Sequence, residues 1–239
     1  MPRLAWFAAI VLALTGCTRG GAPDTAGHAP DARASFVVSR AQFEQMFPQR
    51  DRFYTYAGLV AAIEAYPAFA HTGSRQTRAR EAAAFLAQAA FETDGLRYVK
   101  QIDNGNYAKK CDADEPYGCP AGKAAYYGRG PIMLSWNFNY KHAGDALGID
   151  LLHRPGLVET RPAIAWKTAL WYWMTQKGPG VMTAHRAMVG GAGFGQTINA
   201  MNGALECRGG KPESVRARVR IYEHLARILG VAPGPGETC

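Results

Sequence analysis

The sequence lacks the signatures of several common chemistries. Its six histidines do not have the spacing of metal ligands, and the His-Glu-x-x-His pattern of zinc hydrolases is absent. Gly128 and Gly130 are followed by Pro131, so they do not open a helix onto a phosphate as a dinucleotide fingerprint would. These absences argue against a metalloenzyme or a nucleotide-dependent enzyme. We therefore expect no metal and no cofactor.

Long apolar runs are also missing. Leu4–Leu14 has eleven residues, which is too short to cross a bilayer. With Arg3 before it and Leu14-Thr15-Gly16-Cys17 closing it, this run is typical of a secretion signal, and the closing tetrapeptide resembles a bacterial lipobox. We expect residues 1–16 to be a lipoprotein signal peptide and Cys17 to carry the lipid. The alternative is an ordinary signal peptide with an incidental cysteine.

The segment after the signal is poor in apolar residues. Residues 17–35 are rich in Gly, Ala, Pro, Thr and Asp without apolar periodicity, which predicts a flexible tether. Residues 36–239 remain, enough for one domain with a substantial core. We expect an exported envelope lipoprotein that is anchored to a membrane, and Thr18 after the cysteine favours the outer membrane of a Gram-negative cell. A secreted protein is the alternative.

Acidic residues are outnumbered. Nineteen Asp and Glu stand against 27 Lys and Arg, a formal net charge of +8. Such a charge would suit nucleic acid, an anionic membrane or an acidic wall polymer. The basic residues are dispersed and no nucleic-acid motif accompanies them, so we expect no nucleic-acid binding. We expect a monomer with a solvated basic surface.

Cysteines are few but informative. The chain has five, and export favours disulfides. Without Cys17 the remaining four allow three pairings. We prefer Cys111–Cys119 with Cys207–Cys239, because the first closes a local loop and the second holds the C-terminus. No free thiol would then remain as a nucleophile.

Helical patterns dominate residues 36–239. Apolar-periodic stretches follow three candidate N-cap residues, namely Ser39, Thr55 and Ser74. Thr160 and Pro162 start a further stretch that is apolar around most of its circumference, which predicts a central helix. A last helix is expected over 212–229. Between 97 and 131 the periodicity is lost, which predicts a long ordered loop region with room for one short hairpin.

Glu92 is the first candidate for chemistry. It shares a stripe with Phe85 and Gln88 in an alanine-rich helical segment that ends beside it. A carboxylate at an apolar face, near the negative end of a helix dipole, resists ionisation. It can therefore keep the proton that a general acid needs. The alternative is a surface glutamate at a helix end.

Arg218 is the second residue that is a candidate for a role in the site. At about 100° per residue it falls inside the apolar sector of its helix, between Val215 and Tyr222. A buried guanidinium needs a carboxylate partner, and Glu206 is our candidate. The alternative is an arginine whose head group reaches solvent along its apolar stem.

Five segments resemble the sequence blocks of family 19 chitinases, in the same order and spacing: 85–95, 126–140, 146–152, 166–173 and 198–207. The match spans about Ser39–Cys239. It implies a mainly α, lysozyme-like glycosidase domain with a central substrate cleft. It also implies cleavage of β-1,4 bonds in chitin or chitooligosaccharides with inversion at the sugar carbon. Because the chain is expected in the envelope, the wall polysaccharide peptidoglycan is an alternative substrate.

The resemblance also implies residue roles. Glu92 would be the general acid, and Ser135 would hold the attacking water. Residues expected to bind substrate, or to form the charged network beside it, are Tyr127, Asn139, Asn202, Glu206 and Arg218.

This chain departs from the family pattern around the site. The usual base, a glutamate nine residues after the acid, is Gln101, and an amide can orient a water but cannot take its proton. Asp103 would point to the same side of an extended segment and could replace it. Phe91 and Met133 stand where a histidine and a glutamine are usual. A catalytically weakened glycan-binding lipoprotein is therefore a third hypothesis.

Overall fold

A computed structural model describes residues 36–239, so the predicted signal peptide, tether and lipidated Cys17 lie outside the described residues. The helical elements of this part of the chain, in order, are α1 (Arg40–Met46), α2 (Tyr56–Ile63), α3 (Arg75–Thr93), the 3-10 helices η1 (Asn104–Lys110) and η2 (Lys123–Ala125), α4 (Asn137–Leu147), α5 (Leu157–Thr160), α6 (Pro162–Thr175), α7 (Ala184–Val189), α8 (Phe194–Glu206) and α9 (Pro212–Ile228). Over 36–239 no strand forms, and only isolated bridges join Lys100 to Arg129 and Arg129 to Leu134. The prediction of a mainly α fold is confirmed. The short hairpin for which the sequence left room between 97 and 131 does not form as paired strands.

Three helices begin where the sequence predicted. The side chains of Ser39, Thr55 and Ser74 each accept a hydrogen bond from the backbone N–H three residues on, which satisfies one open donor of the first turn. The predicted start at Thr160 is wrong. Thr160 ends α5, where its hydroxyl donates to the Gly156 carbonyl, and α6 begins at Pro162. Of the helices in 36–239, none is long and apolar enough to cross a membrane.

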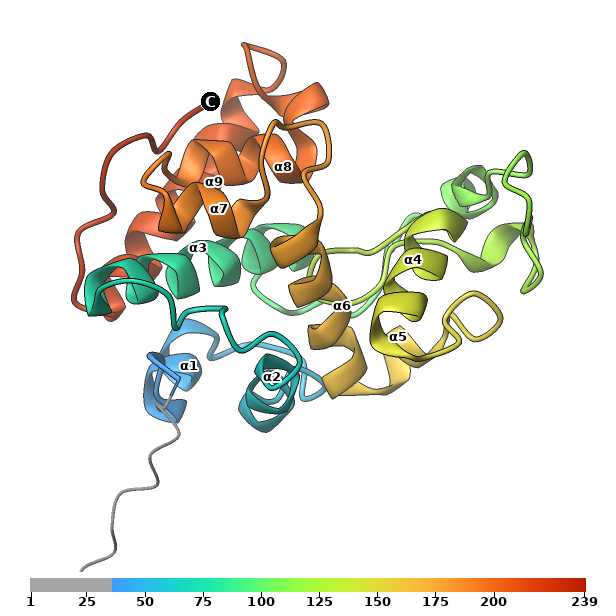
Figure 1. Ribbon diagram of the computed structural model, residues 1–239, viewed down its shortest axis with the longest axis horizontal. Helices are drawn as coiled ribbons and strands as arrows, with labels where there is room; N and C mark the ends of the chain where they lie inside the picture. Colours follow the sequence, from blue (N-terminus) through green and yellow to red (C-terminus); the bar gives the residue numbers. More distant parts are fainter. Residues whose placement is uncertain (1–35) are drawn as a thin grey trace, which may run out of the picture. The chain divides into compact units, whose positions relative to one another are not determined.

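Helix α6 is central, as predicted. It contributes Trp166, Leu170 and Trp173 to the larger core, and Ala165 and Trp171 to a smaller one under α4 and α5. Figure 1 shows α6 running between these two groups of helices, with α3 packed along α9 on one side and α4 and α5 on the other. The broad apolar circumference seen in the sequence is needed because this helix meets a core on more than one face.

Both predicted disulfides are present. Cys111–Cys119 closes the loop between η1 and η2, and Cys207–Cys239 ties the C-terminal segment to the end of α8. That segment lies against the start of α8, where Gly195 N–H donates to the Gly236 carbonyl at 2.7 Å. A Cβ at Gly195 would lie 1.9 Å from a backbone oxygen of this segment, so only glycine allows the approach.

Candidate active site

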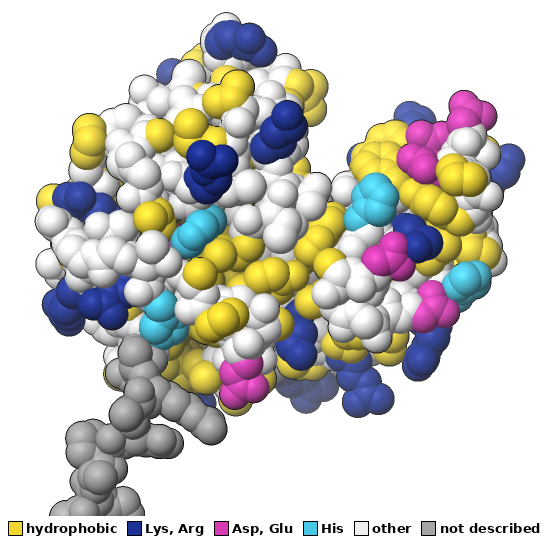
Figure 2. All heavy atoms as spheres, in the orientation of Figure 1, with side chains coloured by type: hydrophobic (Ala, Val, Ile, Leu, Met, Phe, Trp, Pro, Cys, Tyr) yellow, Lys and Arg dark blue, Asp and Glu magenta, His cyan; other side chains and the backbone are white. Residues whose placement is uncertain are grey.

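A cleft of about 800 Å³ opens between the two groups of helices. Its walls come from the end of α3, the chain around Gln101, the segment leading into α4, and α8. The space-filling view shows the molecule hollowed between its α8 and α4 sides (Figure 2). Five of the predicted site residues line this cleft: Glu92, Gln101, Ser135, Asn139 and Asn202. Four do not: Asp103, Tyr127, Glu206 and Arg218.

Arg218 organises the α3 side of the cleft. It is fully buried on α9, and its guanidinium donates two hydrogen bonds of 2.8 Å to the Glu206 carboxylate, which confirms the predicted pair. It also donates to Gln88 Oε1 and to Glu92 Oε1, both at 2.5 Å. Sequence reasoning missed this second ion pair, because periodicity places residues within one helix and says nothing about how α3 approaches α9.

The electrostatics keep the Glu206–Arg218 pair charged. Burial would raise the pKa of Glu206, but hydrogen bonds and charge from Arg218 hold it below its ordinary value. Burial likewise opposes the charge of Arg218, but its two carboxylate partners raise its pKa. The Phe91 ring lies 3.8 Å from the guanidinium carbon. The aromatic residue in place of a histidine therefore covers the cation, in the geometry of a cation–π contact.

Asn202 connects the network to the cleft. It interrupts α8 with non-helical backbone angles, φ −151° and ψ 28°, and its Nδ2 donates to Glu206 Oε1 at 2.8 Å. Because an ionised carboxylate only accepts hydrogen bonds, this contact fixes which way the amide faces. The amide oxygen of Asn202 remains as an acceptor for a ligand in the cleft.

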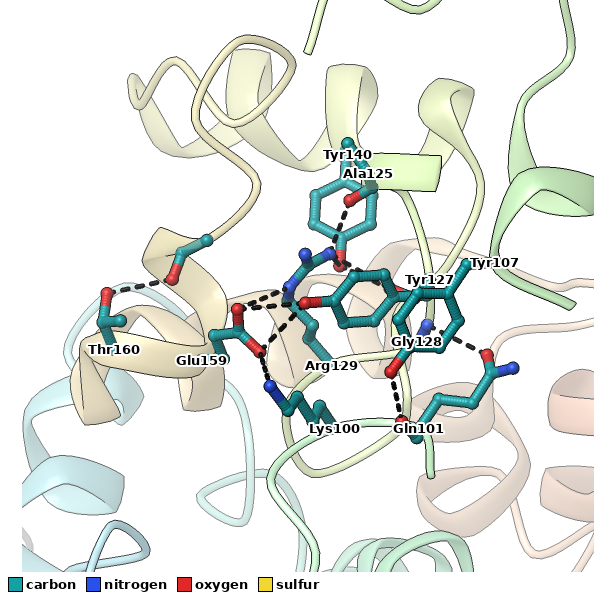
Figure 3. Close-up of polar contacts among 11 residues, drawn as sticks. Lys100, Gln101, Tyr107, Ala125, Tyr127, Gly128, Arg129, Tyr140, Glu159 and Thr160 are labelled. Atoms are coloured by element: carbon teal, nitrogen blue, oxygen red, sulfur yellow. Dashed lines mark hydrogen bonds and ion pairs between the residues drawn. The ribbon is translucent and has the colours of Figure 1, made fainter. Parts of the chain in front are cut away.

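Gln101 is held at both ends of its amide. Its Oε1 accepts from the Gly128 backbone N–H at 3.3 Å, and its Nε2 donates to the Asp103 carbonyl at 2.7 Å. Its own backbone carbonyl accepts from the Tyr107 hydroxyl at 2.7 Å, a contact drawn in Figure 3. The side chain thus joins two stretches of backbone at the cleft wall.

Asp103 does not stand in the cleft beside it. Its own backbone is extended, with φ −70° and ψ 101°, but the chain bends at Ile102, between Gln101 and Asp103, and η1 begins one residue after Asp103. Asp103 caps this 3-10 helix: Oδ1 accepts from Gly105 N at 3.0 Å, and Oδ2 accepts from the Asn106 amide. Both oxygens are therefore used in a local turn of a kind typical for aspartate.

Tyr127, which the resemblance assigns to substrate binding, does not line the cleft but lies behind its wall. Its ring stacks on Tyr107 with centroids 3.8 Å apart, and the Arg129 guanidinium lies 3.5 Å from its centre on an aromatic face. Its hydroxyl donates to Glu159 at 3.1 Å, and Glu159 also meets Lys100 at 3.7 Å (Figure 3). This cluster supports the segment that carries Gly128, so Tyr127 acts on the wall of the cleft.

The segment before α4 presents further cleft residues that sequence reasoning missed. Trp136 and Phe138 both line the cleft, with ring centroids 5.6 Å apart and planes within 20°. Trp136 has φ +78°, and such backbone in a non-glycine residue often marks a functional site. Ser135 precedes it, and its carbonyl accepts from Asn139 Nδ2 at 2.9 Å. The signal was available in the spacing Trp-x-Phe next to the predicted Ser135.

A helical domain with an acidic side chain in a cleft is typical of the lysozyme-like glycosidases, and comparison with known proteins identifies the family. The family model for class I chitinases of glycoside hydrolase family 19 matches residues 37–239. Chitinase 6 of Oryza sativa is 41% identical over 217 residues, covering 87% of this chain and 76% of that protein. The chain belongs to glycoside hydrolase family 19.

Solved structures agree with the fold. A bacterial family 19 chitinase superposes with a TM-score of 0.84 at 61% identity, covering 85% of this chain and all of that one. Chitinase C from Streptomyces griseus gives a TM-score of 0.85 at 60% identity, covering 86% and 81%. The helical, lysozyme-like architecture predicted from the sequence is thus shared with solved members of the family.

Proposed function

We propose that this protein cleaves β-1,4 bonds between N-acetylglucosamine units of chitin or chitooligosaccharides, with Glu92 as the general acid. The observation that carries the proposal is the Glu92 carboxylate in the cleft wall, held through one oxygen by the buried Arg218. Its other oxygen has no partner among the described residues and can deliver a proton to the glycosidic oxygen. The chitinase names of its relatives support the substrate class.

The cleft supplies contacts suited to such a chain. The stacked rings of Trp136 and Phe138 offer an apolar surface for the faces of sugar rings. The amides of Asn139 and Asn202 can bind acetamido groups, and Ser135 adds a hydroxyl nearby. The family implies inversion at the sugar carbon, which requires a second carboxylate roughly 6.5–9.5 Å from the first. Among the described residues that line the cleft, Glu92 alone is acidic, so inversion stays a prediction.

Replacing Glu92 by Gln tests the proposal. Glu92→Gln keeps the shape and an acceptor for Arg218 but removes the dissociable proton, so turnover of a chitooligosaccharide should fall by at least about 10²-fold. Binding of the oligosaccharide, measured by calorimetry, should survive. Glu64→Gln, an exposed position at the end of α2, is the matched control. Equal turnover in wild type and Glu92→Gln would reject Glu92 as the acid.

A second candidate is a glycan-binding protein with little turnover. The fixing of the Gln101 amide between Gly128 and Asp103 favours it, because this side chain presents no proton acceptor to a water. Such a protein would bind N-acetylglucosamine oligomers without cleaving them.

Assays on purified peptidoglycan, run in parallel with chitin, would separate the two polysaccharides as substrates.

We also propose that the chain is exported and lipidated at Cys17, on the sequence pattern of residues 1–17. Cys17→Ser should then release the protein from membranes into the soluble exported fraction. A wild-type protein that is already soluble after export would reject the anchor.

A further inference from the structure

Two fully buried polar side chains lie behind the cleft. Gln88 on α3 and Thr197 on α8 are both 0% exposed, and neither lines the cleft. They reach the site through Arg218, whose guanidinium donates from Nη1 to Gln88 Oε1 at 2.5 Å. A buried amide or hydroxyl is costly unless it is hydrogen-bonded, so the partner of each polar atom matters.

The hydrogen bonds around Gln88 run in one direction. Gln88 Nε2 donates to Thr197 Oγ1 at 2.8 Å, and the single hydroxyl hydrogen of Thr197 goes to the Phe194 carbonyl at 2.7 Å. The guanidinium of Arg218 at one end can only donate, and the carbonyl at the other end can only accept. Every member is therefore satisfied only when the amide oxygen of Gln88 faces Arg218 and its nitrogen faces Thr197.

The Thr197 hydroxyl is what specifies this orientation. Without it, the Gln88 nitrogen would be buried without an acceptor, and the amide could turn that nitrogen toward the guanidinium, which offers only donors. Nη1 of Arg218 would then lose the acceptor that holds it. The contacts of Nε and Nη2, which go to Glu206 and Glu92, would have to position the group alone.

The position of the guanidinium bears directly on Glu92. The group is planar, so fixing Nη1 also fixes Nη2, which donates to Glu92 Oε1 at 2.5 Å. In the proposed function the other oxygen of this carboxylate delivers the proton to the glycosidic oxygen. Misplacing a reacting group by about 1 Å can cost on the order of 10²-fold in rate. A change at Gln88 or Thr197 can therefore alter catalysis without touching the substrate.

We propose, resting on the function above, that Gln88 and Thr197 are positioning residues for Glu92. Thr197 fixes the Gln88 amide, Gln88 fixes the Arg218 guanidinium, and the guanidinium holds the Glu92 carboxylate at the cleft. Helix α8 thus helps to place a carboxylate that α3 carries. The effect falls on kcat and not on KM, because neither positioning residue lines the cleft.

The test compares two threonines with the same local contact. Thr168 on α6 is also 0% exposed, and its hydroxyl also donates to the carbonyl three residues earlier, that of Ala165, at 2.9 Å. Of the two, Thr197 alone accepts from a glutamine amide. With full-length protein and an N-acetylglucosamine hexamer, we expect Thr197→Val to lower kcat by roughly 10-fold and to leave KM within about two-fold of the wild-type value. Thr197→Ser should restore kcat, and Thr168→Val should change neither constant.

Gln88→Met tests the same contacts from the other end and does not depend on how well Thr197→Val folds. It keeps the length of the side chain but removes the amide, so kcat should fall to a similar extent. Adding Thr197→Val to Gln88→Met should lower kcat no further, because Thr197 acts through Gln88.

Three results would overturn the inference and leave the proposed function standing. They are a wild-type kcat in Gln88→Met, an equal loss of kcat in Thr168→Val and Thr197→Val, and additive losses of kcat in the double variant. A wild-type protein that does not cleave the hexamer would overturn both the inference and the proposed function.

Discussion

The two walls of the cleft are built in different ways. On the α3 side, one buried cation on α9 binds side chains from α3 and α8, and every contact of its guanidinium spans more than ten residues of sequence. On the opposite side, loop backbone is held by a glutamine, two tyrosines and a disulfide. The first wall is a charged network between helices. In the second, neutral contacts of Gln101 and Tyr107 hold the loop at the cleft, and the charged groups Lys100, Arg129 and Glu159 lie behind it.

This difference has a chemical consequence. The α3 side keeps a carboxylate at the cleft together with the charges that position it. The loop side presents the amide of Gln101, whose polar atoms are used by the loop itself. A change on the first wall should therefore alter stability and catalysis together. A change on the second wall can alter catalysis with a smaller effect on stability.

The largest effect should follow from removing Arg218. Arg218→Met would leave Glu206 buried without its cation, and breaking a buried ion pair in this way costs about 3–5 kcal/mol. Urea denaturation would measure the loss of unfolding free energy. Arg216→Met, on the exposed face of the same helix, should cost under about 0.5 kcal/mol. A similarly small loss for Arg218→Met would show that the network does not hold the α3 wall together.

The same contrast explains what could be predicted. Arg218 and Glu206 were paired from the sequence because an apolar helical sector makes a charge within it conspicuous and a buried charge needs a partner. The fixing of Gln101 by Gly128 was not predicted, because loops have no periodicity that places one backbone stretch against another. Asp103 was not placed for the same reason: a bend at Ile102 precedes it, and both of its carboxylate oxygens accept hydrogen bonds within the turn that it caps. Tyr127 was assigned to substrate by resemblance alone, and its contacts lie behind the wall.

The disulfides give the next largest effects, and they should differ. Cys207–Cys239 spans 32 residues and Cys111–Cys119 spans 8, so loop-closure entropy predicts losses of about 3.7 and about 2.5 kcal/mol on removal. The double Cys→Ser variants would be compared by urea denaturation. We expect removal of Cys111–Cys119 to impair cleavage more despite the smaller stability loss, because this disulfide closes the loop between η1 and η2 on the loop side of the cleft. Equal effects on cleavage would remove the functional distinction between the two walls.

The smallest expected effect is also the most specific to the loop wall. Tyr107→Phe removes the hydroxyl that donates to the Gln101 carbonyl but keeps the ring stacked on Tyr127, at a cost of about 1 kcal/mol. Tyr56→Phe is its matched control, since the Tyr56 hydroxyl also donates to a backbone carbonyl, that of Val38, away from the cleft. Both variants should lose similar stability in urea. Only Tyr107→Phe should raise KM for a chitooligosaccharide, by a few-fold, because the backbone that carries Gln101 is then less firmly placed. If the two variants have the same KM, the contacts behind the loop wall serve stability alone, and the cleft is shaped by the residues that line it.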